Sequence, residues 1–139
     1  MLINGACHCG LISFRAEMDP AQIVVCHCVD CQVLSGSAFR IVAEAPIGTF
    51  NIRGSPKSYI FTQHGSCIAQ FFCTVCGTPL YATAQENPTS VIIRLGCVEQ
   101  RAQLKPAVQI WRGSALPWLA ELETVPTSSE QQGSFPAPA

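Results

Sequence analysis

Short apolar runs separated by turn-forming residues dominate the hydrophobic pattern of this chain. The runs are rich in β-branched and aromatic side chains, and they are interrupted by Pro46, by Gly54-Ser55-Pro56 and by His64-Gly65. This pattern is typical of strands and predicts them over residues 11–17, 22–25, 39–45, 49–53, 58–62, 68–72 and 90–95. We therefore expect a mainly β protein built from two packed antiparallel sheets.

Helical periodicity is weak along the whole sequence. The best candidate covers residues 115–122 around Trp118, with Ser114 as its N-cap, and it predicts one short turn. From Pro126 onward the chain becomes polar and proline-rich, which leaves too little apolar surface to offset the entropy of ordering. We predict one domain over residues 1–125 and a disordered tail over residues 126–139.

Composition narrows the classes of function. With 48% hydrophobic and 12% charged residues among 139, the chain has enough apolar material for a core of its own. Its net charge of −1 gives no basic surface, so we expect no nucleic-acid partner. No apolar run reaches the roughly 18 residues of a membrane span, and we expect no membrane association. Residues 1–5 lack the features of an export signal, so we expect a cytoplasmic protein.

Seven of the nine cysteines lie in three tight clusters. C-x-C and C-x-x-C spacings let neighbouring thiolates reach one tetrahedral zinc ion at about 2.3 Å. One C-x-C and one C-x-x-C together supply the four ligands of a closed structural site. The remaining C-x-C-x-x-C supplies three and leaves a position open for water or substrate. The sequence thus predicts one structural and one catalytic zinc, from the clusters Cys7-His8-Cys9, Cys26-His27-Cys28-Val29-Asp30-Cys31 and Cys73-Thr74-Val75-Cys76.

Disulfides and thiol redox chemistry are the alternative uses of these cysteines. The odd number of cysteines, the missing export signal and the poor disulfide geometry of C-x-C pairs argue against disulfides. A redox C-x-x-C motif opens a helix after a strand, whereas Gly77 and Pro79 directly follow Cys76. Zinc ligation is the better interpretation of all three clusters.

Three segments in a fixed order carry a resemblance to a known family: residues 5–10, 26–39 and 72–80, followed by Ile110-Trp111 and Pro117-Trp118. Over about residues 5–125 the chain resembles the glutathione-dependent formaldehyde-activating family, which also includes centromere protein V. The resemblance implies a mainly β, zinc-ribbon-like fold in two sheets. It also implies a structural zinc on Cys7, Cys9, Cys73 and Cys76 and an active-site zinc on Cys26, Cys28 and Cys31.

The same resemblance implies a reaction. Glutathione and formaldehyde would be joined to S-hydroxymethylglutathione, which is formally a carbon–sulfur lyase reaction in reverse. Glutathione would be the co-substrate, and the catalytic residues would be Cys26, Cys28 and Cys31. Independently, three thiolate ligands make zinc a poor generator of hydroxide and a good partner for an incoming thiol. Because a tightly held thiolate is less nucleophilic, a labile second zinc is compatible with this chemistry.

One segment departs from the family pattern. Residues 95–99 keep the glycine, Gly96, but replace what usually follows it. The choice of aldehyde and thiol is therefore open. Two alternatives remain beside the leading interpretation: a non-catalytic zinc-stabilised binding module of the same fold, and a thiol-dependent enzyme that acts on another aldehyde.

Polar residues near the clusters have several expected roles. His8 and His27 each lie between two ligand cysteines, so we expect their rings to face away from the metal. His64 lies in an expected hairpin turn, where it is either solvated or lines the site as a proton shuttle. Asp30, inside the second cluster, is a candidate proton acceptor.

The remaining candidates are cysteines outside the clusters and scattered cations. We expect Cys67 and Cys97 to be small buried residues rather than ligands. Glutathione has two carboxylates, and the possible partners for them, none singled out by the sequence, are Arg40, Arg53, Lys57 and Arg94.

Overall fold

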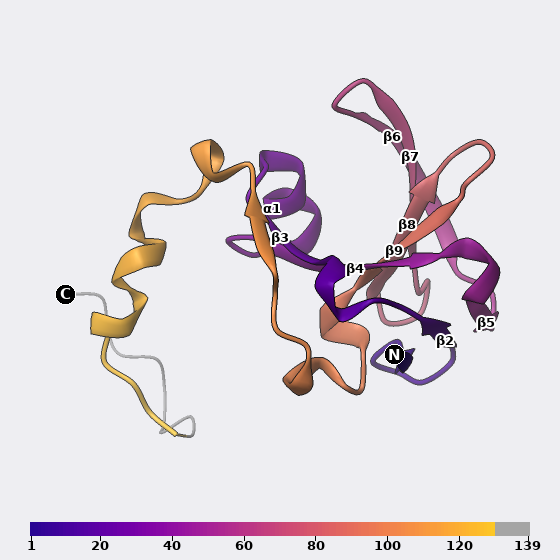
Figure 1. Cartoon of the computed structure of the whole chain (residues 1–139), viewed down its shortest axis with the longest axis horizontal. Coiled ribbons are helices and arrows are strands. Elements are labelled where there is room, and N and C mark those ends of the chain that lie inside the picture. The colour runs from indigo at the N-terminus through magenta and orange to yellow at the C-terminus, as the bar shows by residue number, and fades with distance from the viewer. Residues whose placement is uncertain (130–139) are drawn as a thin grey trace.

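The computed structural model describes residues 1–129 and confirms the mainly β architecture in two sheets (Figure 1). The smaller sheet has the order β1-β2-β5, formed by Leu2–Ala6, Ser13–Glu17 and Asn51–Arg53. The larger sheet has the order β10-β3-β4-β9-β8-β7-β6. Its strands are β3 (Ile23–Cys26), β4 (Arg40–Pro46), β6 (Lys57–Gln63), β7 (Ser66–Phe72), β8 (Pro79–Ala84), β9 (Ser90–Arg94) and β10 (Val108–Ile110). The predicted disordered tail falls largely on residues 130–139, which lie outside the described part.

The hydrophobic core lies between the two sheets. On β2, Phe14 and Ala16 are buried while their neighbours are more exposed. On the facing strands β4 and β9, Ala43, Val91 and Ile93 have no exposed surface. This alternation of core-facing and outward-facing residues is what two packed layers require. It leaves the outer face of the large sheet free to form a site.

All seven predicted strands are present, with ends shifted by at most two residues. Three further strands were not predicted. β1 contains Asn4 and Gly5 and β8 begins with Pro79, all residues of low strand propensity, and β10 has only three residues. β10 also pairs in parallel with β3, so the large sheet is mixed at this edge rather than wholly antiparallel.

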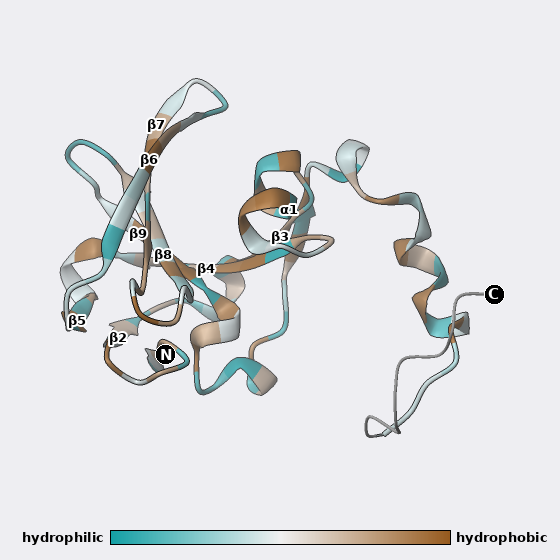
Figure 2. Cartoon of the chain, turned by 180° about the vertical axis from the view of Figure 1, so that it is seen from behind, coloured by the Kyte–Doolittle hydropathy of each residue, from teal (hydrophilic) through white to brown (hydrophobic). Residues whose placement is uncertain are grey.

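One α-helix was missed and one helical segment was only partly anticipated. α1 (Val29–Ser35) begins at Cys28, whose sulfur accepts a hydrogen bond from the backbone N–H of Cys31, and ends at Gly36 with φ of 63°. Near the C-terminus a 3-10 helix covers Pro117–Thr124, longer than the expected single turn. Its N-cap is Leu116, so the assignment of Ser114 was wrong. Figure 2 shows this segment set apart from the sheets, in agreement with its lack of buried residues.

The β6–β7 hairpin extends beyond the rest of the large sheet, and its tip turns toward α1 (Figure 1). The turn contains His64 and Gly65, both with positive φ, which confirms the predicted hairpin turn. Gln63 and His64 thereby reach the second cysteine cluster, as described below. Within residues 1–129 no helix has both the length and the apolar character needed to cross a membrane.

Candidate metal centres

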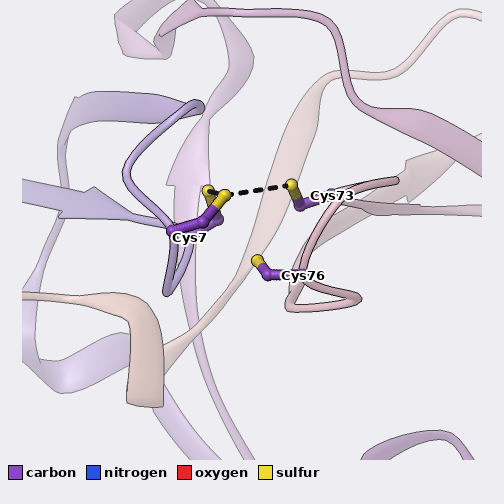
Figure 3. A group of neighbouring side chains, drawn as sticks. Cys7, Cys73 and Cys76 are labelled. Atoms are coloured by element: carbon purple, nitrogen blue, oxygen red, sulfur yellow. Dashed lines mark hydrogen bonds between the residues drawn. The ribbon is translucent and has the colours of Figure 1, made fainter.

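Four cysteines from two distant loops meet at the first centre. Cys7 and Cys9 follow β1, and Cys73 and Cys76 lie between β7 and β8. Their sulfur atoms all lie within 4.8 Å of one another, with Cys7 to Cys9 at 3.5 Å and Cys9 to Cys73 at 3.8 Å. Figure 3 shows the sulfurs of Cys7, Cys73 and Cys76 pointing into one common space. Tetrahedral zinc with sulfur ligands at about 2.3 Å requires sulfur–sulfur separations of about 3.8 Å, so the donor set fits this metal.

Both loops of this centre have the same construction. A glycine with positive φ follows each cysteine pair, Gly10 at 79° and Gly77 at 74°. Backbone N–H groups close each turn: Gly10 donates to the carbonyl of Cys7 at 3.0 Å, and Gly77 to that of Cys73 at 2.9 Å. The turns bring each cysteine pair within reach of one ion.

Three buried cysteines form the second centre. Cys26 ends β3, Cys28 caps α1 and Cys31 lies in its first turn, and the three are 7%, 3% and 3% exposed. Their sulfurs also lie within 4.8 Å of one another. Among residues 1–129 no further cysteine, histidine or carboxylate joins the group at this distance. The cluster therefore provides a three-ligand set with room for one exogenous ligand.

The pKa values of the three thiols in the second centre are shifted in different directions. Burial raises the pKa of Cys26, and it raises that of Cys31 to about 12 against the opposing charge of Arg40. For Cys28 burial acts in the same direction, but hydrogen bonds from the Cys31 backbone N–H and from the side chains of Cys31 and His64 outweigh it and lower the pKa. Three neighbouring thiols cannot all ionise without a cation. A divalent metal would allow all three to act as thiolates, which is a second sign that the residues fit zinc.

A cavity of about 260 Å³ adjoins this cluster and is lined by Cys26, Cys31, Arg40, His64 and Trp111, among others. The ring of His64 stacks on that of Trp111, with centroids 4.0 Å apart and planes 8° from parallel. The Gln63 side chain donates a hydrogen bond to the sulfur of Cys28 at 3.5 Å. The hairpin tip therefore forms one wall of the cavity, and His64 lines this cavity while its side chain remains exposed to solvent.

The histidines between ligand cysteines do not join the clusters. His27 is 2% exposed, packs against Phe39 and shares a hydrogen bond of 2.7 Å with the side chain of Gln109. His8 is exposed. Asp30 is exposed and does not line the cavity, which gives no support to its role as a proton acceptor.

The two cysteines outside the clusters differ from each other. Cys97 is partly buried and donates to the carbonyl of Pro79 at 3.1 Å. Cys67 is exposed, so its expected burial was wrong, because it lies next to the turn of the β6–β7 hairpin, opposite Thr62. Within the described residues 1–129, neither cysteine belongs to a group that could hold a metal ion.

Two of the four candidate cations are buried beside the second centre. Arg40 is 9% exposed and Arg94 is 4% exposed, whereas Arg53 and Lys57 are exposed. Burial, reinforced by the charge of Arg40, lowers the pKa of Arg94 to about 9. No local sequence pattern predicts this difference in burial, because it depends on which strand face each residue occupies in the assembled sheet.

A sequence model described as "Glutathione-dependent formaldehyde-activating enzyme" matches residues 2–114. The chain belongs to this family. Both cysteine clusters lie inside the matched range. The crystal structure of a Rhodobacter sphaeroides protein has a similar fold, with a TM-score of 0.61 at 22% sequence identity, covering 76% of this chain and 98% of that one. No curated protein matches the sequence. The assignment of the chain to the family thus rests on the sequence match. The structural neighbour agrees with it in fold.

Proposed function

We propose that the protein is a zinc-dependent enzyme that joins glutathione and formaldehyde to S-hydroxymethylglutathione, in the carbon–sulfur lyase class. The observation that carries the proposal is the group of three buried cysteine sulfurs beside a cavity, with no fourth protein ligand among residues 1–129. Membership of the family supports the choice of substrates.

The two clusters have different roles in this proposal. Cys7, Cys9, Cys73 and Cys76 hold a structural zinc, because they supply four ligands and connect two parts of the fold. Cys26, Cys28 and Cys31 hold the catalytic zinc. When bound there, zinc would act as a Lewis acid and favour the thiolate form of an incoming thiol.

The reaction itself needs no oxidant or reductant. The glutathione sulfur attacks the formaldehyde carbon, one C–S bond forms, and the carbonyl C=O becomes C–OH. The thiol proton is transferred in the process to the carbonyl oxygen. The cavity orients the two reactants next to each other, and proximity of this kind accounts for a large share of rate enhancement in such condensations.

The initial rate of S-hydroxymethylglutathione formation tests the proposal. Because the condensation also proceeds unaided, zinc-loaded protein is compared with an enzyme-free control and with Cys28→Ser, by NMR or stopped-flow detection of the adduct. We expect acceleration by the wild-type protein and none by the variant. A wild-type rate equal to both controls would reject the enzyme. If thiol binding then persisted, the binding module or another aldehyde would take its place.

His64 is positioned to carry the proton between the thiol and the carbonyl oxygen, since it lines the cavity and neighbours Cys28. We expect His64→Asn to reduce turnover by about 10²-fold or more, the usual contribution of a general acid or base, without changing zinc content or glutathione affinity. Asparagine tolerates the positive φ of 49° at this position, so the turn is preserved.

His8→Asn is the matched control, because His8 is exposed beside the structural centre. Steady-state kinetics, metal analysis and glutathione titration of both variants separate the outcomes. Equal turnover in the two variants would remove His64 from the mechanism.

A further inference from the structure

Two guanidinium groups are buried next to each other without a counter-ion. Arg40 and Arg94 lie on adjacent strands, β4 and β9, of the large sheet. Each donates one hydrogen bond of 2.9 Å to the same oxygen, Oε1 of Gln70, which is itself 6% exposed. Within residues 1–129 neither guanidinium forms an ion pair with a carboxylate. Three of their nitrogen atoms also have no hydrogen-bond partner there: Nε of Arg40, Nε of Arg94 and Nη1 of Arg94.

Such an arrangement is costly in a protein that binds nothing there. Burial of a charge is strongly unfavourable unless it is paired and hydrogen-bonded, and two like charges repel each other. One neutral amide oxygen shared by two cations does not compensate for either. An anionic ligand would accept hydrogen bonds from the unsatisfied N–H donors and would offset the positive charge.

The position of Arg40 connects this pair to the second metal centre. Cys26 and Arg40 are directly opposite in the β3–β4 register, so their side chains lie on the same face of the sheet. Arg40 lines the cavity that contains Cys26 and Cys31, and it also lines an adjoining cavity of about 410 Å³ together with Arg94 and Arg101. A ligand held at the cysteines would therefore find the arginines along the same wall.

The metal centre alone does not account for both cations. Zinc with three thiolates has a net charge of −1, which one arginine offsets. None of the hydrogen bonds of Arg40 or Arg94 in the structure reaches a cysteine sulfur. A substrate thiolate on the metal would bring a second negative charge, but it would leave the buried N–H donors of the two guanidinium groups without an acceptor.

We propose that Arg40 and Arg94 form a carboxylate-binding subsite for the thiol substrate of the neighbouring cysteine centre. The class of ligand is a thiol that carries a carboxylate, and the guanidinium forks provide the paired N–H donors that a carboxylate accepts. The identification of that thiol as glutathione rests on the proposed function. The subsite selects against thiols without a carboxylate, since binding them leaves the free N–H groups of the two arginines without an acceptor.

Binding of glutathione and of its diethyl ester to the zinc-loaded full chain tests this by calorimetry. The ester keeps the thiol and removes both carboxylates. We expect the wild type to bind glutathione at least about tenfold more tightly than the ester, the usual effect of a charge-assisted hydrogen bond. We expect Arg94→Gln to bind the two compounds alike, whereas the control Arg53→Gln, on the small sheet, keeps the wild-type preference. A purely steric effect of the ester groups would persist in Arg94→Gln.

The melting temperature of Arg94→Gln in the absence of ligand gives a second readout. Because the variant loses an unpaired buried charge, we expect its melting temperature to be equal to or higher than that of the wild type, although it binds glutathione less tightly. If the wild type bound glutathione and its ester with equal affinity, the subsite would be overturned and the proposed function would stay intact. This comparison needs no variant. A carboxylate preference without catalysis would keep the subsite and reject the reaction. Absence of binding by either thiol would overturn both.

Discussion

Cys73→Ser is expected to unfold or aggregate the protein and to remove one of two zinc ions. Cys7 and Cys9 continue from the small sheet, while Cys73 and Cys76 lie between strands of the large sheet, so the four-cysteine centre connects the two layers. Cys9 and Cys73 are 64 positions apart in the sequence. Structural zinc sites contribute about 10–16 kcal/mol of binding free energy that is available only to the folded state. That exceeds or equals the typical net stability of a domain, about 5–15 kcal/mol.

Cys28→Ser is the matched variant at the other centre and is expected to remain folded. Cys26, Cys28 and Cys31 all lie within one short stretch, from the end of β3 to the first turn of α1, and join no distant strands. Cys28 is also the N-cap of α1, and serine is a favourable N-cap residue, so the helix start is preserved.

Zinc analysis by mass spectrometry and thermal melts by circular dichroism compare the two variants with the wild type. We expect close to one zinc per chain and a near-native melt for Cys28→Ser, and little soluble folded protein for Cys73→Ser. Equal loss of stability in both variants would contradict the division into a structural and a catalytic centre.

Local spacing in the sequence was sufficient to predict which cysteines meet. C-x-C and C-x-x-C pairs specify a turn geometry by themselves, and the ligand count then separates a set of four from a set of three. The structure brings together the same two sets of cysteines. Strands with strong β-branched or aromatic content were also predictable, while β8 and β1 depend on burial in the assembled sheet.

Most of the features that the sequence did not reveal depend on long-range assembly. Arg40, Arg94 and Gln70 come from three strands, and no local pattern distinguishes these arginines from Arg53. The stacking of His64 on Trp111 likewise joins the β6–β7 turn to the end of β10. α1 was missed because its helix propensity is weak and its N-cap is a cysteine, which is not a usual N-cap residue.

Glutathione is expected to bind the zinc-loaded protein on the order of 100-fold more tightly than S-methylglutathione, which has the same carboxylates but no ionisable thiol. The difference isolates the sulfur, because the contacts expected at Arg40 and Arg94 are common to both compounds. Mutation of a residue that hydrogen-bonds to a metal ligand typically lowers metal affinity by about 10–100-fold. Loss of the contact between the thiol sulfur and the metal itself should lower the affinity for the thiol by at least as much.

The pH dependence of this binding follows from the ordinary pKa of a free thiol, about 8.5. At pH 7 free glutathione is mostly protonated, and binding as a thiolate releases about one proton. Affinity should therefore rise by up to about tenfold per pH unit below that pKa and level off above it. Calorimetry in buffers of different ionisation enthalpy measures the released proton, and Cys28→Ser should lose both the preference for the thiol and the proton release. If the thiol and its methyl ether bound equally, with no proton released at any pH, the three-cysteine centre would not be a thiol site, and the non-catalytic binding module would become the better description of this family member.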